Sequence, residues 1–387
     1  MDDFLRLSAS TGRFTYGAPR AFSFGDDGRL LWFLRSTGPT DAFDSLWVLD
    51  TATGAETRLA DPRELSPEPG TLPAAERRLR ERIRLVAAGI GSYALSGDGR
   101  SAVFPLYGRL YRVGYEGTPT VAPEELPAAG PALDPRLNAD GSRTAYVTDD
   151  ALYTHPGGRV SPADGARWGI AEFAAAEELD RGRGHWWSPD GETLLAARVD
   201  ESALQRRHFA DPAHPELPAE DFAYPEAGGP NAEVQLWVLG PGGGRVRLDW
   251  DAVTYPYVSD ADWESETEIL LTVQDRLQQC VLLLSADPAT GRTREPTGSG
   301  GPYAPPTGAS SSPPTWPRGC RTRWSRCCSG SPSTPSPPRW CCPAATSPAG
   351  GCPSSWTATA APASRTCPPS RAAGSTASGG PTGASRW

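Results

Sequence analysis

The chain has 387 residues, with 46 acidic and 37 basic side chains and a formal net charge of −9. It lacks the basic balance of nucleic-acid-binding proteins, and its length suffices for two or three ordinary domains with buried cores. The first residues do not follow the charged-then-apolar order of a secretory signal, and no apolar run approaches the roughly 20 residues that span a bilayer. We expect a cytoplasmic protein without nucleic-acid or membrane partners.

Residues 20–295 have the pattern of an all-β protein, in which short β-rich runs alternate with turn signals. A unit of strand, Asp-Gly turn and strand recurs at residues 22–34, 93–104, 137–147 and 186–196. Asp-Gly is typical of tight hairpins, because both central positions tolerate positive φ. A second pair of β runs follows these units, so each repeat has four strands over roughly 40–70 residues. This predicts a partial β-propeller of four to five blades, with short helical insertions.

One helical insertion is predicted over residues 74–86. Its apolar residues Leu79, Ile83 and Val86 are spaced as one buried stripe. Arg77, Arg80 and Arg84 fall on another face, and from the residues alone we interpret that face as solvated.

A second helical segment is predicted over residues 166–179, with Ile170, Phe173 and Ala174 turned inward. It ends on two adjacent carboxylates, Glu177 and Glu178. Acidic side chains at a helix C-terminus oppose the macrodipole at a cost of roughly 0.3–1 kcal/mol each. We therefore expect a cation beside the pair: either the neighbouring Arg181 and Arg183, or the ammonium group of a ligand.

The composition changes abruptly at residue 296. From there on the chain has no Leu, Ile, Val, Phe, Met, Asp, Glu, Asn, Gln or His, yet it holds seven of the eight cysteines. We expect residues 296–387 to be disordered, because an odd cysteine count without an export signal does not indicate a disulfide framework. Beyond Tyr303 every residue type has a codon with G or C in second position, as in a GC-rich gene read out of frame. We interpret residues 296–387 as a frame-shifted tail and residues 1–295 as an incomplete propeller.

Three separate motifs resemble the propeller of the dipeptidyl peptidase IV family, which belongs to the prolyl oligopeptidase class of serine peptidases. They are residues 177–191 (EELDRGRGHWWSPDG), 200–202 (DES) and 224–231 (YPEAGGPN). Residues 80–93 (RERIRLVAAGIGSY) are similar to the arginine segment of that family. The resemblance covers about residues 20–295. It implies an eight-bladed propeller that caps an α/β-hydrolase domain.

The resemblance also implies site residues. Glu177 and Glu178 would grip the α-ammonium of a peptide, and Arg84 would bind the carbonyl between its first two residues, so that peptide N-termini are the partners. Two carboxylates around one ammonium form a charge-assisted cluster, which a nearby guanidinium keeps ionised. We interpret Trp186 and Trp187 as core residues. Members of the family are often homodimers.

The catalytic half of the family is missing from this sequence. No G-x-S-x-G nucleophile elbow occurs in it, and none of the four histidines is placed for a catalytic triad. His208 and His214 near Asp211 lack a third spaced ligand, so we expect no metal and no cofactor. The sequence thus favours the substrate-selecting, truncated part of a serine-type dipeptidyl aminopeptidase that releases Xaa-Pro or Xaa-Ala dipeptides, inactive alone. The alternative is a non-catalytic propeller that binds peptides or proteins.

Overall fold

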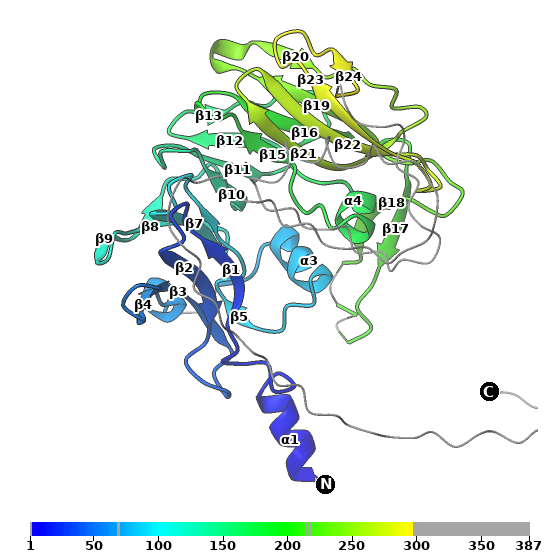
Figure 1. Ribbon diagram of the computed structural model, residues 1–387. Helices are drawn as coiled ribbons and strands as arrows, with labels where there is room; N and C mark the ends of the chain where they lie inside the picture. Colours follow the sequence, from blue (N-terminus) through cyan, green and yellow to red (C-terminus); the bar gives the residue numbers. More distant parts are fainter. Residues whose placement is uncertain (1, 68–69, 214, 217, 297–387) are drawn as a thin grey trace, which may run out of the picture. The chain divides into compact units, whose positions relative to one another are not determined.

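The computed structural model describes residues 2–67, 70–213, 215–216 and 218–296. The expected disordered, frame-shifted tail therefore lies outside the described residues, apart from Pro296. All described helices and strands belong to one compact unit of the chain (Figure 1). No helix in the described part is long and apolar enough to cross a membrane.

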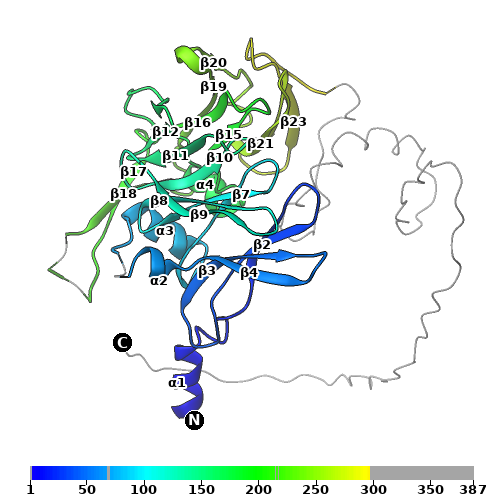
Figure 2. The same ribbon diagram turned by 90° about the vertical axis from the view of Figure 1, so that its left-hand side faces the viewer.

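Five sheets follow one another along the chain, three with four strands and two with five, and each has a row of four strands side by side in chain order (Figures 1 and 2). The first contains β1 (Arg20–Phe24), β2 (Leu30–Arg35), β3 (Phe43–Asp50) and β4 (Ala55–Ala60), and β5 (Ala88–Gly89) pairs in parallel with β3. The second contains β6 (Ala94–Leu95), β7 (Ser101–Leu106), β8 (Arg109–Tyr115) and β9 (Pro119–Leu126). The third contains β10 (Leu133–Leu137), β11 (Thr144–Thr148), β12 (Ala151–His155) and β13 (Gly158–Arg159).

The fourth sheet carries an insertion. It contains β15 (His185–Trp187), β16 (Leu194–Asp200), β19 (Glu233–Leu239) and β20 (Arg245–Arg247), and β14 (Arg167–Trp168) pairs with the far end of β16. A separate hairpin, β17 (Gln205–Phe209) with β18 (Glu220–Tyr224), is inserted between β16 and β19. The fifth sheet contains β21 (Tyr257–Ser265), β22 (Glu268–Gln274), β23 (Val281–Ala286) and β24 (Thr293–Arg294). Five sheets confirm the predicted partial propeller of four to five blades.

The hydrophobic cores of the described residues lie between successive sheets. Strand β16 shows why: Leu195, Ala197 and Val199 pack toward the fifth sheet, whereas Leu194 and Ala196 pack toward the third. Side chains alternate along a strand, so a strand between two sheets is apolar on both faces. The adjacent Trp186 and Trp187 obey the same rule, because they belong to opposite cores. The prediction that both are core residues is confirmed.

The Asp-Gly turns differ in one respect from the expectation. In the turn after β6, Gly99 has a φ of 69°, whereas Asp98 is not among the residues with positive φ. The Asp98 carboxylate instead accepts a hydrogen bond from the Arg100 backbone N–H at 3.0 Å. Gly191 and Asp190, after β15, repeat this arrangement with a φ of 73° and a bond of 2.9 Å from Glu192 N. The glycine alone supplies the left-handed conformation, and the aspartate caps the turn.

The helices are short. They are α1 (Asp2–Ser10), α2 (Pro62–Leu65), α3 (Ala74–Arg82), α4 (Phe173–Glu178) and the 3-10 turn η1 (Pro241–Gly243). The predicted helix over residues 166–179 is therefore wrong in its first half, because Arg167 and Trp168 form β14. Of the residues predicted to turn inward, Ile170 is buried, but Phe173 and Ala174 are only half-buried, and Ala175 and Leu179 are buried instead.

The predicted faces of α3 are wrong for Ile83, Val86 and Arg80. Ile83 and Val86 lie beyond the helix end and are 53% and 59% exposed. The buried residues are Glu76 and Arg80, whose side chains pair at 2.7 Å. The Arg80 guanidinium also donates to the carbonyl oxygens of Ala87 and Gly89. Arg80 is buried because it donates to these carbonyls and to the Glu76 carboxylate, whereas Arg77 and Arg84 are exposed, as predicted.

Candidate functional site

Glu177 and Glu178 lie at the C-terminal end of α4, in the segment that leaves β14 and returns to β15. A bridge between Ile170 and Arg183 closes the base of this segment. The buried Ala175 and Leu179 fix which face of α4 turns inward, and both glutamates are exposed. The helix therefore presents two adjacent carboxylates to solvent.

The cation beside the pair comes from α3. The Arg82 Nε donates to Glu177 Oε1 at 2.5 Å, with the two side chains 28% and 33% exposed. The Arg82 guanidinium also lies 6.0 Å from the centre of the Phe173 ring. Helices α3 and α4 accordingly lie side by side in both views (Figures 1 and 2). The cation that contacts the glutamate pair is thus Arg82, and not Arg181 or Arg183 as the sequence suggested.

Arg181 has another partner. Its Nη2 donates to Glu172 Oε2 at 2.6 Å, and these side chains are only 3% and 4% exposed. The chain turns away from the helix at Asp180, which has a φ of 55°. Arg183 donates from Nε to the His185 carbonyl and lies over the Trp186 ring. The expectation that Arg181 neutralises the glutamate pair is wrong.

Neither Arg84 nor Glu178 has a polar side-chain partner among the described residues. Arg84 follows the end of α3 with a φ of 53° and is exposed. Within the described part of the chain, the side chains of Arg84 and Glu178 form no ion pair or hydrogen bond. The role of Arg84 stays a prediction. Sequence reasoning missed Arg82, although it lies in the arginine segment, because the helix was expected to continue past it.

A row of aromatic rings connects α4 with the inserted hairpin. The Phe173 ring meets the Tyr224 ring edge to face at a centroid distance of 5.1 Å. Tyr224 in turn contacts Phe222, which stacks on Phe209 at 5.0 Å. Such pairs are typically worth 0.5–1.5 kcal/mol beyond their burial. The hairpin therefore buttresses the start of the helix that carries the glutamates.

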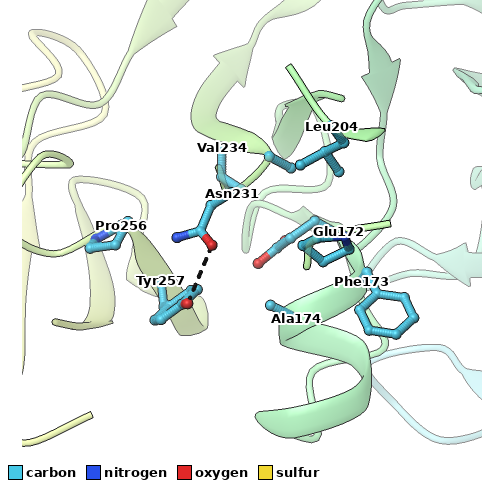
Figure 3. Close-up of a pocket in the computed structure, with 10 residues that line it drawn as sticks. Glu172, Phe173, Ala174, Leu204, Asn231, Val234, Pro256 and Tyr257 are labelled. Carbon is cyan, nitrogen blue, oxygen red and sulfur yellow. Dashed lines mark hydrogen bonds between the residues drawn. The ribbon is translucent and has the colours of Figure 1, made fainter. Parts of the chain in front are cut away.

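A small cavity lies beside the N-terminus of α4, and Figure 3 shows the residues that line it. Glu172, Asn231 and Tyr257 supply its polar groups, and the Tyr257 hydroxyl donates to Asn231 Oδ1 at 3.4 Å. Its volume is about 10 Å³, enough for one water-sized group. The cavity has no room for the peptide chain that would follow an N-terminal ammonium group. The exposed end of α4 is therefore the better candidate for ligand binding.

Comparison with known proteins identifies the family. The model of the dipeptidyl peptidase IV N-terminal region matches residues 109–309, which is more than half of the chain. The chain belongs to this family. The matched range includes α4 and all three motifs that follow it, whereas α3 with Arg82 and Arg84 precedes the range.

Individual relatives agree with this placement in the dipeptidyl peptidase IV family. Human dipeptidyl peptidase 8 is 27% identical over 191 residues, covering 41% of this chain and 21% of that protein. Rat inactive dipeptidyl peptidase 10 is 29% identical over 169 residues, covering 39% of this chain and 21% of that protein. The chain thus spans about a fifth of the length of these relatives. The structure of Porphyromonas gingivalis dipeptidyl peptidase 4 matches 74% of this chain and 41% of its own, with a TM-score of 0.53 and 16% identity, which supports the shared fold.

The second and third family motifs supply structural contacts. Asp200 accepts a hydrogen bond from the Ser202 backbone N–H at 2.9 Å, and Glu201 pairs with Arg167 at 2.9 Å. These bonds fix the exit of β16 and its pairing with β14. In the third motif, Asn231 Oδ1 accepts a hydrogen bond from the Tyr257 hydroxyl, and Asn231 lines the small cavity.

The base of the segment that carries α4 leaves no room at Gly184. A Cβ there would lie 2.3 Å from the backbone N and C of Ile170. We expect Gly184→Ala to lower the free energy of unfolding by about 1–3 kcal/mol, because the two backbones must separate. Urea unfolding measures the loss. Gly182→Ala is the matched control, since nothing lies within 4 Å of its added Cβ. Equal stability of the two variants would contradict the close approach.

Proposed function

We propose that this chain is the peptide-selecting part of a serine-type dipeptidyl aminopeptidase and that it recognises a free peptide N-terminus. The observation that carries the proposal is the end of α4, where Glu177 and Glu178 are adjacent and exposed and only Glu177 has a cationic partner, Arg82, among the described residues. Membership of the dipeptidyl peptidase IV N-terminal family supports it.

The chemistry of the pair suits an ammonium group. Two carboxylates beside one guanidinium leave a net negative charge, and the helix C-terminus adds a partial negative charge. An α-ammonium has three donors and no acceptor, so it can bridge both carboxylates in charge-assisted hydrogen bonds. An acetylated N-terminus has no charge, keeps a single N–H donor and adds a carbonyl acceptor. Discrimination between these two ends is therefore the expected property of the site.

We propose different roles for Arg82 and Arg84. Arg82 already contacts Glu177, and we propose that it keeps this carboxylate ionised and oriented. Arg84 remains our proposed donor to the peptide carbonyl.

The covalent chemistry is assigned to a different part of the protein. The 387 residues contain no G-x-S-x-G nucleophile elbow. We propose that release of Xaa-Pro or Xaa-Ala dipeptides requires a hydrolase domain and that this chain alone hydrolyses nothing. Homodimer formation and a cytoplasmic location stay predictions.

The experiment uses the purified chain and two tripeptides, Gly-Pro-Gly and N-acetyl-Gly-Pro-Gly. Titration calorimetry is expected to detect binding of the free amine and at least a tenfold weaker interaction with the acetylated peptide. In parallel, a Gly-Pro chromogenic substrate is expected to stay intact. Equal binding of the two peptides would contradict the amine site, and release of the chromophore would contradict the inactivity of the isolated chain.

A second candidate function is a binding module without any catalytic partner. It is favoured by one observation: a relative named inactive dipeptidyl peptidase 10 is as similar to this chain as dipeptidyl peptidase 8 is, at 29% and 27% identity. A module that binds proteins through other surfaces would not respond to acetylation of a peptide amine. The same titration therefore separates recognition of a peptide amine from protein binding through other surfaces.

A further inference from the structure

Helix α4 is not stable by itself. It has six residues, and Glu172 at its N-cap makes no side-chain capping bond. Isolated helices shorter than about 12 residues are marginal in water. Its last turn contains two acidic residues and no basic one, which weakens it further. The orientation of Glu177 and Glu178 must therefore come from tertiary contacts.

A buried ion pair joins the two ends of the helix. Glu172 stands immediately before α4, and Arg181 stands three residues after its last residue. Their side chains meet at 2.6 Å and are 4% and 3% exposed. The backbone N–H of Arg181 also donates to the Ala175 carbonyl at 3.0 Å. The pair thus closes the segment around the helix.

The same guanidinium fastens the helix to the next sheet. Arg181 Nε donates to the carbonyl of Val258 in β21 at 2.9 Å, and its Nη1 donates to the carbonyl of Arg183 at 2.8 Å. All three guanidinium nitrogens are therefore engaged, with one carboxylate and two backbone oxygens. A planar guanidinium holds such a set in a fixed geometry, which an ammonium group does not.

Stability alone does not explain such a pair. Burying two charges costs several kcal/mol per ion in desolvation, and apolar replacements of similar volume are often as stable or more so. What the pair provides is a fixed orientation of the chain on both sides of α4.

We propose that Glu172 and Arg181 are positioning residues, which hold Glu177 and Glu178 in a single orientation relative to β21. Their importance for amine binding rests on the proposed function. Their role in fixing the orientation of α4 does not depend on the proposed function.

Two variants test the proposal. Arg181→Lys keeps the charge but cannot reach all three oxygens at once. The double change Glu172→Met with Arg181→Leu removes both charges together, so it leaves no unpaired charge in the interior. The matched control is Asp44→Asn, which breaks the Arg20–Asp44 pair in the first sheet. That pair joins its atoms at 2.7 Å with the aspartate 5% exposed, and it lies away from α4.

Hydrogen exchange gives a readout that needs no ligand. The amides of Ala176, Leu179 and Arg181 donate within the segment. We expect them to exchange at least tenfold faster in both variants, while the amides of β16 and β22 keep their protection. Asp44→Asn should leave the α4 amides unchanged. Unchanged exchange of these amides in the double variant would overturn the proposal, whatever the ligand result.

Peptide titration gives the second readout. We expect both variants to bind the free-amine tripeptide at least tenfold more weakly than the unmodified chain, with a ratio of free to acetylated binding that approaches one. Faster exchange at α4 with unchanged peptide affinity would overturn the positioning role. If the unmodified chain does not distinguish the two peptides, the proposed function fails, and the exchange result still decides whether Glu172 and Arg181 hold α4.

Discussion

Replacing both Glu177 and Glu178 with glutamine should weaken binding of a free-amine tripeptide by at least ~100-fold, because each lost hydrogen bond between charged groups is worth about 1.5–3 kcal/mol. Glutamine keeps the size and one acceptor of each side chain, so the loss reports charge. The single changes should be unequal. Arg82 already shares the Glu177 carboxylate, whereas Glu178 has no competing cation among the described residues. Glu178→Gln should therefore account for more of the loss.

Titration of the variants against the free and acetylated tripeptides measures this effect. Glu56→Gln is the control, because Glu56 is also a partly exposed glutamate in a close arginine pair, with Arg35 at 2.6 Å. Such exposed pairs contribute about 0–1 kcal/mol, so none of these variants should unfold. Retention of free-amine selectivity by the double variant would exclude the glutamate pair as the amine site.

Acid should destabilise the protein through His185. Its ring is fully buried, Nδ1 donates to the Gly169 carbonyl at 2.8 Å, and Asp134 lies 4.0 Å away. Burial is the main cause that lowers the pKa of His185 to about 4, against the opposing pull of Asp134. The unfolded chain protonates this histidine near pH 6.5, whereas the folded chain does so only near pH 4. Stability is therefore complete above pH 6.5 and falls as the pH drops toward 4.

The size of the effect follows from linkage. Between pH 7 and pH 4.5 the contribution of His185 to the free energy of unfolding should fall by roughly 2–3 kcal/mol. Urea unfolding of the unmodified chain and of His185→Asn at both pH values isolates it, because asparagine cannot take up a proton and other groups act in both proteins. The difference between the two proteins should shrink at the lower pH. Parallel pH dependence would show that His185 does not titrate as described.

The sheets were predictable because their determinants are local. Asp-Gly turns such as Asp98-Gly99 and Asp190-Gly191 mark the first hairpin in each of the first four sheets, and alternation on β16 marks a strand with two buried faces. Even there, the detailed turn type was wrong. The Asp-Gly dipeptide does not distinguish a turn in which both residues have a positive φ from a turn in which only the glycine has a positive φ.

The helical parts were predicted less well, because contacts distant in sequence decide them. The carbonyls of Ala87 and Gly89 draw Arg80 inward, and Val258 does the same for Arg181. Nothing in the local pattern of apolar residues reveals these acceptors. The glutamate pair was identified because motif resemblance located it, whereas Arg82 depended on where α3 ends.

The order of the sheets has a consequence for partial unfolding. Each core joins two successive sheets, so within the described residues the fifth sheet packs only on the fourth. A part of a fold can open locally at a lower free energy than global unfolding requires. Since Arg181 ties α4 to Val258 of the fifth sheet, fraying of that one sheet releases the glutamates while the other four persist. Ligand binding would then be lost under conditions in which most of the structure is still folded.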